Sequence, residues 1–175
     1  EFLREMEFNR LLSSVISAYG EYKFESLIDV KNDNLEKLES INDKNYHLIK
    51  DIKEIDGWLQ EAEDSGEIAV DTETDSLDPH QANLVGISFS TKIGKACYIP
   101  IGHKSIKCLD KIKVLEKIKP LLEDPSIKKI GQNIKFDFII FFKNGINLKS
   151  MEDTMLMSYV LDAGKNRHNM DTLSE

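Results

Sequence analysis

Two acidic residues, Asp71 and Glu73, follow directly after the apolar run at residues 68–70. On a β-strand, residues two apart project from the same face, so these carboxylates are expected side by side. Like charges at that distance are costly unless a cation binds or a pKa rises. Ligation by oxygen alone suits hard divalent ions such as Mg²⁺ or Mn²⁺. The segment therefore predicts a metal site; the alternative is a solvated strand end with two ordinary acids.

A third acid, Asp137, stands in the segment Gly131-Gln132-Asn133-Ile134-Lys135-Phe136-Asp137. Gly131 is expected to end a strand, Asn133 to be the N-cap of a helix, and Asp137 to follow one turn later on the same face. A carboxylate near a helix N-terminus and a strand end lies where an α/β sheet builds its ligand crevice. The alternative is a routinely capped helix with Asp137 exposed.

The elements that must position these acids follow from hydrophobic periodicity. Apolar residues recur at helical spacing over residues 2–19, and Gly20 ends that run. Residues 21–45 are rich in charged residues and read as a linker. Short apolar runs then predict strands at 46–49, 68–70, 84–90, 96–101 and 127–130, and helical patterns begin at Asp51 and cover 109–122, 134–143 and 154–161, with another starting at Met170. Three adjacent strands followed by alternating helices and strand indicate an α/β domain on a mixed sheet from about residue 46.

Charge and composition limit the class of protein. The chain has 175 residues and a net charge of −8. Residues 1–66 hold 8 basic and 16 acidic side chains, and the remainder holds 15 of each, so bulk charge cannot hold a nucleic acid there. No apolar run is long enough to span a bilayer, and no signal segment opens the chain, so we expect no membrane. Cys97 and Cys108 lack metal-ligand spacing and are expected to be free thiols in a reducing cytoplasm.

Taken together, the segments resemble a known family. The strings VDTETDSL, ANLVGISFS, YIPIGH, KKIGQNIKFD, DTMLMSYVLDAG and RHNMDTLSE are similar, in order and spacing, to the 3′→5′ exonuclease domain of family A DNA polymerases, the family of bacterial DNA polymerase I. The similarity runs from about Trp58 to Glu175. EFLREMEF at the front is similar to the segment that leaves the 5′-nuclease domain in this family.

The resemblance implies an RNase H-like exonuclease fold and a DEDD metal centre, in which four carboxylates bind two divalent ions, Mg²⁺ or Mn²⁺. Asp71, Glu73 and Asp137 match three of them. The fourth belongs to a Tyr-x-x-x-Asp motif, which we expect beyond the helix starting at Met170. The segment from Tyr159 to Asp162 has the wrong spacing to replace it.

The resemblance also assigns residues to the substrate strand. Leu77 matches a leucine that packs against the terminal base, Asn133 and Phe136 match residues along the path of the strand, and Arg167 matches a basic residue near the scissile phosphate. The alternatives are that Leu77 and Phe136 belong to the core and that Arg167 is an ordinary surface residue. We expect His103 and His168 to be loop residues without a catalytic role, and Asp153 to cap the following helix.

The implied reaction is proofreading hydrolysis of the 3′-terminal phosphodiester of single-stranded DNA. The implied organisation is a helical tail of a 5′-nuclease domain at 1–20, a linker at 21–45 and the exonuclease domain at 46–175, cut before its third motif and therefore weak or inactive in isolation. Polymerase and 5′-nuclease domains of the same polypeptide are the expected partners. Two alternatives remain: an inactive module that supports the polymerase or binds single strands, and a related ribonuclease.

Overall fold

The computed structural model describes residues 8–19, 45–164 and 167–173. Two compact units are found, Glu1–Glu39 and Ser40–Glu175. Helix α2 (Asn9–Tyr19) belongs to the first unit and confirms the helical prediction from Asn9 onward. The predicted start of that helix, Gly20 and nearly all of the predicted linker lie outside the described residues.

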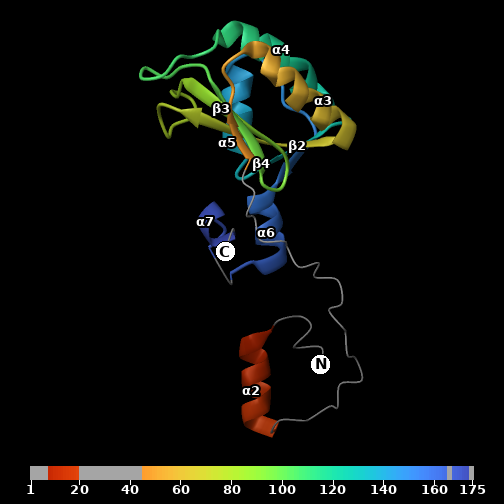
Figure 1. Cartoon of the computed structure of the whole chain (residues 1–175). Helices are drawn as coiled ribbons and strands as arrows, with labels where there is room; N and C mark the ends of the chain where they lie inside the picture. Colours follow the sequence, from red (N-terminus) through yellow and green to blue (C-terminus); the bar gives the residue numbers. More distant parts are fainter. Residues whose placement is uncertain (1–7, 20–44, 165–166, 174–175) are drawn as a thin grey trace. The chain divides into compact units, whose positions relative to one another are not determined.

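The second unit is built on a six-stranded mixed sheet (Figure 1). Its strands are β1 (Asn45–Leu48), β2 (Glu67–Thr74), β3 (Leu84–Lys92), β4 (Lys95–Pro100), β5 (Lys128–Gly131) and β6 (Met151–Asp153). The spatial order is β1-β4-β3-β2-β5-β6. Strands β2, β3 and β4 form an antiparallel meander, whereas β1 pairs parallel with β4, β5 with β2, and β6 with β5. The predicted α/β class with a mixed sheet is confirmed.

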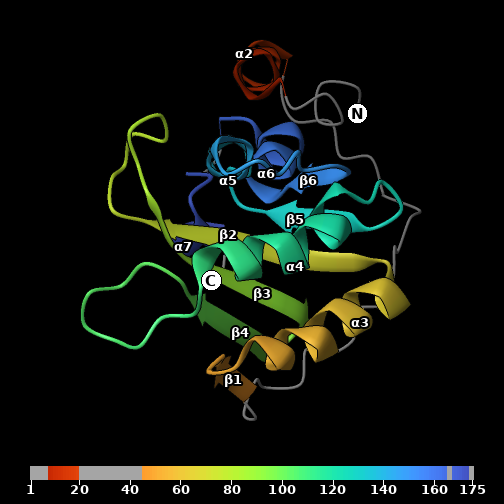
Figure 2. The same cartoon turned by 90° about the horizontal axis from the view of Figure 1, so that it is seen from above.

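Helices α3 (Ile55–Ser65) and α4 (Lys111–Glu123) pack on one face of this sheet (Figure 2). Trp58 and Ala62 of α3 and Ile118 of α4 are buried in one core with alternate residues of the central strands. The first turn of the helix predicted from Asp51 is a separate 3₁₀ turn, η1 (Ile52–Glu54), capped by Asp51. Gly66 ends α3 with φ of +74°, a left-handed conformation that glycine adopts without a steric penalty.

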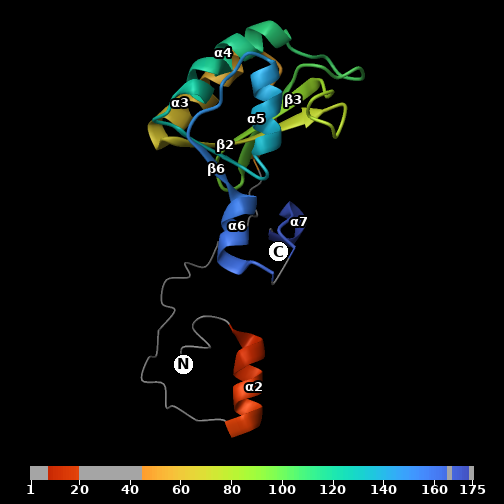
Figure 3. The same ribbon diagram turned by 180° about the vertical axis from the view of Figure 1, so that it is seen from behind.

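The remaining helices follow β5 and β6. Helix α5 (Lys135–Lys143) begins just after β5, and α6 (Thr154–Asp162) begins directly after β6. A short helix, α7 (Met170–Leu173), lies with α6 on the side of the sheet away from α3 and α4 (Figures 1 and 3). Among the described residues, no helix has the length and hydropathy of a membrane span.

Candidate active site

The candidate site is built at the carboxyl end of β2, in the middle of the sheet. Side chains alternate along this strand: Val70 and Thr72 are buried, and Asp71 and Glu73 face the other side, as predicted. The parallel partner β5 pairs with β2 only as far as Ala69 and then ends. The backbone beyond Ala69 therefore has no strand neighbour on that side, and it needs other hydrogen-bond partners.

Asp137 supplies one of these partners from the first turn of α5. Its Oδ1 accepts hydrogen bonds from the backbone N of Thr72 at 2.9 Å and from the Thr72 Oγ1 at 2.6 Å. The side chain is only 2% exposed, so the alternative of a solvent-exposed Asp137 is wrong. The contact places the Asp137 carboxylate at the residue that separates Asp71 from Glu73.

The three acids interact electrostatically. Burial raises the pKa of Asp137 to about 6, against the opposing effect of the Thr72 hydrogen bonds, and the negative charge of Asp71 adds to the rise. Burial also raises the pKa of Asp71, and the charge of Glu73 contributes. Like charges held together in a partly desolvated place destabilise one another, and a bound cation would relieve that repulsion.

The turn between β5 and α5 differs from the prediction. Asn133 is not the N-cap: its φ is +55°, and the N-cap position belongs to Ile134, which makes no side-chain cap. The capping carboxylate comes from Asp153 instead, whose oxygens accept from the backbone N of Asn133 at 3.0 Å and of Ile134 at 3.1 Å. Asp153 also accepts from Met155 and Leu156 and so caps α6, as predicted.

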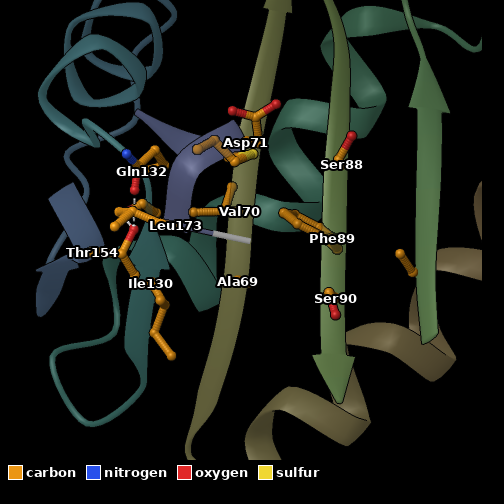
Figure 4. Close-up of a pocket in the computed structure, with 13 residues that line it drawn as sticks. Ala69, Val70, Asp71, Ser88, Phe89, Ser90, Ile130, Gln132, Thr154 and Leu173 are labelled. Atoms are coloured by element: carbon orange, nitrogen blue, oxygen red, sulfur yellow. Dashed lines mark hydrogen bonds between the residues drawn. The ribbon is translucent and has the colours of Figure 1, made fainter. Parts of the chain in front are cut away.

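A cavity of about 390 Å³ lies beside Asp71, between the central strands and α7 (Figure 4). Its walls are small or apolar side chains of β2, β3, β4 and β5, with Met170 and Leu173 of α7. At its edge, the Thr154 Oγ1 donates to the Gln132 Oε1 at 2.5 Å, and the Gln132 Nε2 donates to the backbone O of His168 at 2.8 Å. These contacts connect the end of β5 with α6 and with the segment before α7.

The predicted substrate residues are distributed around this sheet edge. Leu77 stands in the loop after β2 and is 96% exposed, so the core alternative is wrong for this residue. Phe136 is partly buried and packs against the core. Asn133 and Arg167 are exposed. Because β2 and β5 are parallel, the loop of Leu77 and the start of α5 follow strand ends at the same edge of the sheet.

The two histidines lie outside helices and strands, as expected, but each has a partner. His103 Nε2 lies 2.6 Å from the Tyr98 hydroxyl oxygen. His168 is buried, its Nδ1 shares a hydrogen bond of 2.7 Å with Ser158, and its ring contacts that of Tyr159. Cys97 and Cys108 are free thiols, as predicted.

The donor set fits a hard divalent ion, because Asp71, Glu73 and Asp137 offer carboxylate oxygens and two of them carry raised pKa values. The structure brings Asp71 close to both other acids, whereas Glu73 lines a different cavity, with Tyr98. Within the described part of the chain, no three acidic, histidine or cysteine side chains already surround one ion position.

Sequence reasoning missed three contributors to this site. Thr72 stands between Asp71 and Glu73, so strand alternation directs its hydroxyl to the buried face. A hydroxyl there could have suggested a hydrogen-bond partner. Asp153 was recognised as the cap of one helix, but nothing in the sequence shows that it serves two. Tyr98 lies 27 positions from Asp71 in sequence and has no local signal; only the strand register places it near the site.

Comparison with known proteins agrees with this geometry. Residues 46–175 match the family model described as 3′-5′ exonuclease. DNA polymerase I of Pseudomonas aeruginosa is 43% identical over 135 residues, and that of Rhizobium leguminosarum is 41% identical over 154 residues. Each match covers 74% of this chain and 15% of the relative, so the chain spans about one seventh of their length.

Solved structures share the fold. The POL domain of Pol1 from M. smegmatis, in complex with DNA primer-template and dNTP, superposes with a TM-score of 0.60 at 18% identity, over 74% of this chain and 22% of that one. Brucella melitensis NrnC with bound Mg²⁺ gives a TM-score of 0.53 at 23% identity, over 74% and 58%. The sheet thus has the RNase H-like exonuclease architecture that the sequence resemblance implied, and the chain belongs to the 3′-5′ exonuclease family, whose model it matches over residues 46–175.

Proposed function

We propose that this domain hydrolyses the 3′-terminal phosphodiester of single-stranded DNA and releases a nucleoside 5′-monophosphate. Water adds to the terminal phosphorus, the bond to the 3′-oxygen of the preceding nucleotide breaks, and that oxygen takes a proton. The observation that carries the proposal is the pairing of Asp71 with the buried Asp137, whose carboxylate is fixed on Thr72 at the carboxyl end of β2. Two carboxylates held in this way would bind a cation that assists hydrolysis.

Asp71, Glu73 and Asp137 would be three of the four carboxylates that hold two divalent ions, Mg²⁺ or Mn²⁺, and the fourth is the acid expected beyond the helix starting at Met170. Bound in this way, divalent ions lower the pKa of a water molecule and neutralise charge on the leaving oxygen. The protein's part is to hold the carboxylates in place. Thr72 donates both its backbone N–H and its hydroxyl to one oxygen of Asp137, so that side chain is oriented before any ion arrives.

The substrate strand would be held by few charges. Residues 67–175 carry 15 basic and 15 acidic side chains, so non-specific attraction to phosphates is weak. Stacking of bases on apolar side chains is worth about 1–3 kcal/mol per base and does not depend on sequence. The exposed Leu77 and the half-buried Phe136 would provide such surfaces, with Asn133 along the strand and Arg167 at a phosphate.

The setting of the domain is also part of the proposal. The curated relatives are DNA polymerases about seven times longer than the matched part, so polymerase and 5′-nuclease domains of one polypeptide are the proposed partners. The free thiols Cys97 and Cys108 suit a cytoplasmic location, where disulfides are rare.

The test combines metal binding with hydrolysis. Binding of Mg²⁺ or Mn²⁺ is measured by titration calorimetry for the unaltered chain, Asp71→Asn and Asp137→Asn, and hydrolysis by a full-length polymerase that carries this domain is followed on single-stranded DNA and RNA of the same sequence. The matched control is Glu67→Gln, because Glu67 lies on the same face of β2 at its other end. We expect both Asp variants to lose metal binding while Glu67→Gln keeps it.

Three outcomes would change the proposal. Metal binding that survives both Asp substitutions would remove these acids from the site. Faster cleavage of RNA than of DNA would favour the ribonuclease alternative. A full-length polymerase that carries this domain, binds the metal and yet leaves a 3′ end intact would favour the alternative of an inactive module.

A further inference from the structure

The loop that follows β2, residues 75–83, carries Leu77, and we call it the Leu77 loop. Its two ends are fixed to each other by Asp75 and Asn83. The Asp75 Oδ1 accepts a hydrogen bond from the backbone N of Asn83 at 2.7 Å, and the Asp75 Oδ2 accepts one from the Asn83 Nδ2 at 2.9 Å. The Leu77 side chain is 96% exposed, so packing does little to hold it in place. The position of this leucine therefore depends on the backbone of the loop.

Lys143, in the last turn of α5, anchors the Leu77 loop from outside. Its Nζ donates to the backbone O of Pro79 at 2.9 Å, of His80 at 2.8 Å and of Ala82 at 2.8 Å. An ammonium group has three protons, so each of them finds an acceptor in the loop. Three carbonyls that converge on one point suit a compact cation, and here a lysine side chain supplies it.

Helix α5 thus holds the chain on both sides of Leu77. In its first turn, Asp137 accepts hydrogen bonds from the backbone N and the Oγ1 of Thr72, which precedes the loop. In its last turn, Lys143 donates to the carbonyls that follow Leu77. Asp137 and Lys143 are six positions apart in the sequence, which is about 9 Å along a helix. One rigid element therefore sets how far the exposed leucine lies from the acids.

We propose that Lys143 is a positioning residue, which holds Leu77 in the place that binding of the substrate strand requires by fixing the Leu77 loop to α5. This inference rests on the proposed function, in which Leu77 provides a surface for a base. A loop that must be ordered when the strand binds costs affinity, and a loop that is already ordered avoids that cost. Since its three protons are bonded to carbonyls, Lys143 acts through the loop and not by pairing with a phosphate.

The test measures binding of a fluorescent single-stranded DNA oligonucleotide to the whole chain. Lys143→Met keeps an unbranched apolar side chain and removes the three donors, so affinity should fall about 2- to 10-fold, the cost of ordering the loop on binding. The matched control is Lys119→Met on α4, which removes the same charge. Lys119 also donates its Nζ to a backbone carbonyl, that of Gly145 at 2.7 Å, and its substitution should leave DNA binding unchanged. Equal affinities in the two lysine variants would refute the proposal.

A double substitution separates positioning from a general effect on the fold. If Lys143 acts through Leu77, adding Lys143→Met to Leu77→Ala should weaken DNA binding no further. A second loss of the same size in the double variant would show that Lys143 acts by another route, and would overturn the proposal. Lys143→Gln is the second single variant, because its amide can donate only two hydrogen bonds, and its affinity should lie between those of Lys143→Met and the unaltered chain.

Mobility of the loop gives an independent measurement. Nuclear magnetic resonance relaxation of the backbone amides reports motion on the picosecond to nanosecond timescale. In Lys143→Met the amide of Leu77 should become more mobile, while that of Thr72, which is bonded to Asp137, should stay rigid. A Leu77 amide as rigid as in the unaltered chain would show that Lys143 does not hold the loop.

Metal binding and the Leu77 variant separate this inference from the proposed function. Lys143→Met should bind Mg²⁺ or Mn²⁺ as the unaltered chain does, because the bonds between Asp137 and Thr72 remain. Loss of metal binding would show that Lys143 supports the acids and not the loop. If Leu77→Ala weakens DNA binding and Lys143→Met does not, only this inference is wrong. If Leu77→Ala binds DNA normally, the strand assignment in the proposed function fails, and this inference fails with it.

Discussion

Leu77 carries an apolar side chain that is almost entirely in solvent. If it contacts the terminal base, Leu77→Ala should weaken binding of single-stranded DNA by about 1–3 kcal/mol. Its free energy of unfolding should change by less than about 0.5 kcal/mol, because no buried contact is lost. Ile93→Ala is the control: Ile93 is 74% exposed at the β3–β4 turn, the other end of the strands.

Fluorescence anisotropy of a labelled oligonucleotide and urea unfolding provide the two measurements. Phe136→Ala is expected to weaken DNA binding and also to lower the free energy of unfolding, because this ring packs against the core. A Leu77→Ala protein that binds DNA like Ile93→Ala would show that the exposed leucine has no part in strand binding.

Asp137 makes stability depend on pH in the absence of metal. Its pKa rises from 3.8 to about 6 on folding, so between these values the folded protein holds a proton that the unfolded chain has released. Stability must therefore fall as pH rises from about 4 to about 6. Asp137→Asn keeps an oxygen that can accept from Thr72 and carries no charge. It should be more stable than the unaltered chain above pH 6, by roughly 1–3 kcal/mol.

Thermal or urea unfolding at several pH values between 4 and 7, without divalent ions, measures this difference. Adding Mg²⁺ should reverse the order at pH 7, because only the unaltered chain gains binding energy. Glu67→Gln should follow the unaltered chain throughout. If the stability of Asp137→Asn falls between pH 4 and 6 as steeply as that of the unaltered chain, the Asp137 carboxyl is not the group that titrates.

At the scale of elements, Asp153 connects two helices. Its carboxylate accepts from the first backbone N–H groups of α6 and from those preceding α5, the helix that carries Asp137. A lost N-cap costs typically about 0.5–2 kcal/mol. Asp153→Ala should therefore destabilise the domain by roughly 1–4 kcal/mol, about twice the effect of Asp110→Ala. Asp110 is the matched control because it caps α4 alone.

Urea unfolding gives the size of the effect, and hydrogen exchange shows where it acts. In Asp153→Ala the amides at the starts of α5 and α6 should lose protection together, while those of α4 keep it. Protection lost in α6 alone would mean that the bonds to Asn133 and Ile134 contribute nothing.

Hydrophobic periodicity predicted most of the helices and strands correctly, because the apolar face of each can be read from its own stretch of sequence. Helix α3 and strands β2, β3 and β4 lie within a few residues of their predicted bounds. Strand β6 was not predicted, since Met151–Asp153 is only three residues long and its order depends on pairing with β5. Asn133 was misassigned as a cap because the competing carboxylate, Asp153, stands 20 residues away in sequence.

The candidate site was predicted only in part, because a local sequence pattern displays only some of its features. Strand alternation placed Asp71 and Glu73 on one face, but the burial of Asp137 depends on tertiary contacts that no local pattern displays.

Lys129, outside the site, is a further example of such burial: a lysine is expected in solvent, yet this one is fully buried. Its Nζ donates to the backbone O of Asp124 and of Ile127 at 2.5 and 2.6 Å, carbonyls in the turn after α4.

At the scale of the whole molecule, Ser40–Glu175 forms a compact unit with a core of its own. A chain that begins at Ser40 is therefore expected to fold and to bind Mg²⁺ as the complete chain does. Its thermal midpoint should differ by less than about 2–4 °C, the shift that 1 kcal/mol produces in a domain of this size. Calorimetry of both chains gives the comparison. A midpoint well below that of the complete chain would show that residues 1–39 contribute to the stability of the fold.

The bond between Thr72 and Asp137 joins residues 65 positions apart. A ribosome adds about 5–20 residues per second, so Thr72 is synthesised roughly 3–13 s before its partner. Throughout that interval Asp71 and Glu73 exist without the third acid. A nascent chain therefore cannot assemble this cluster early, and the chemistry it supports becomes available only after β5 and the start of α5 have been made. The length of chain between the acids, which contains β3, β4, α4 and β5, sets this delay during synthesis.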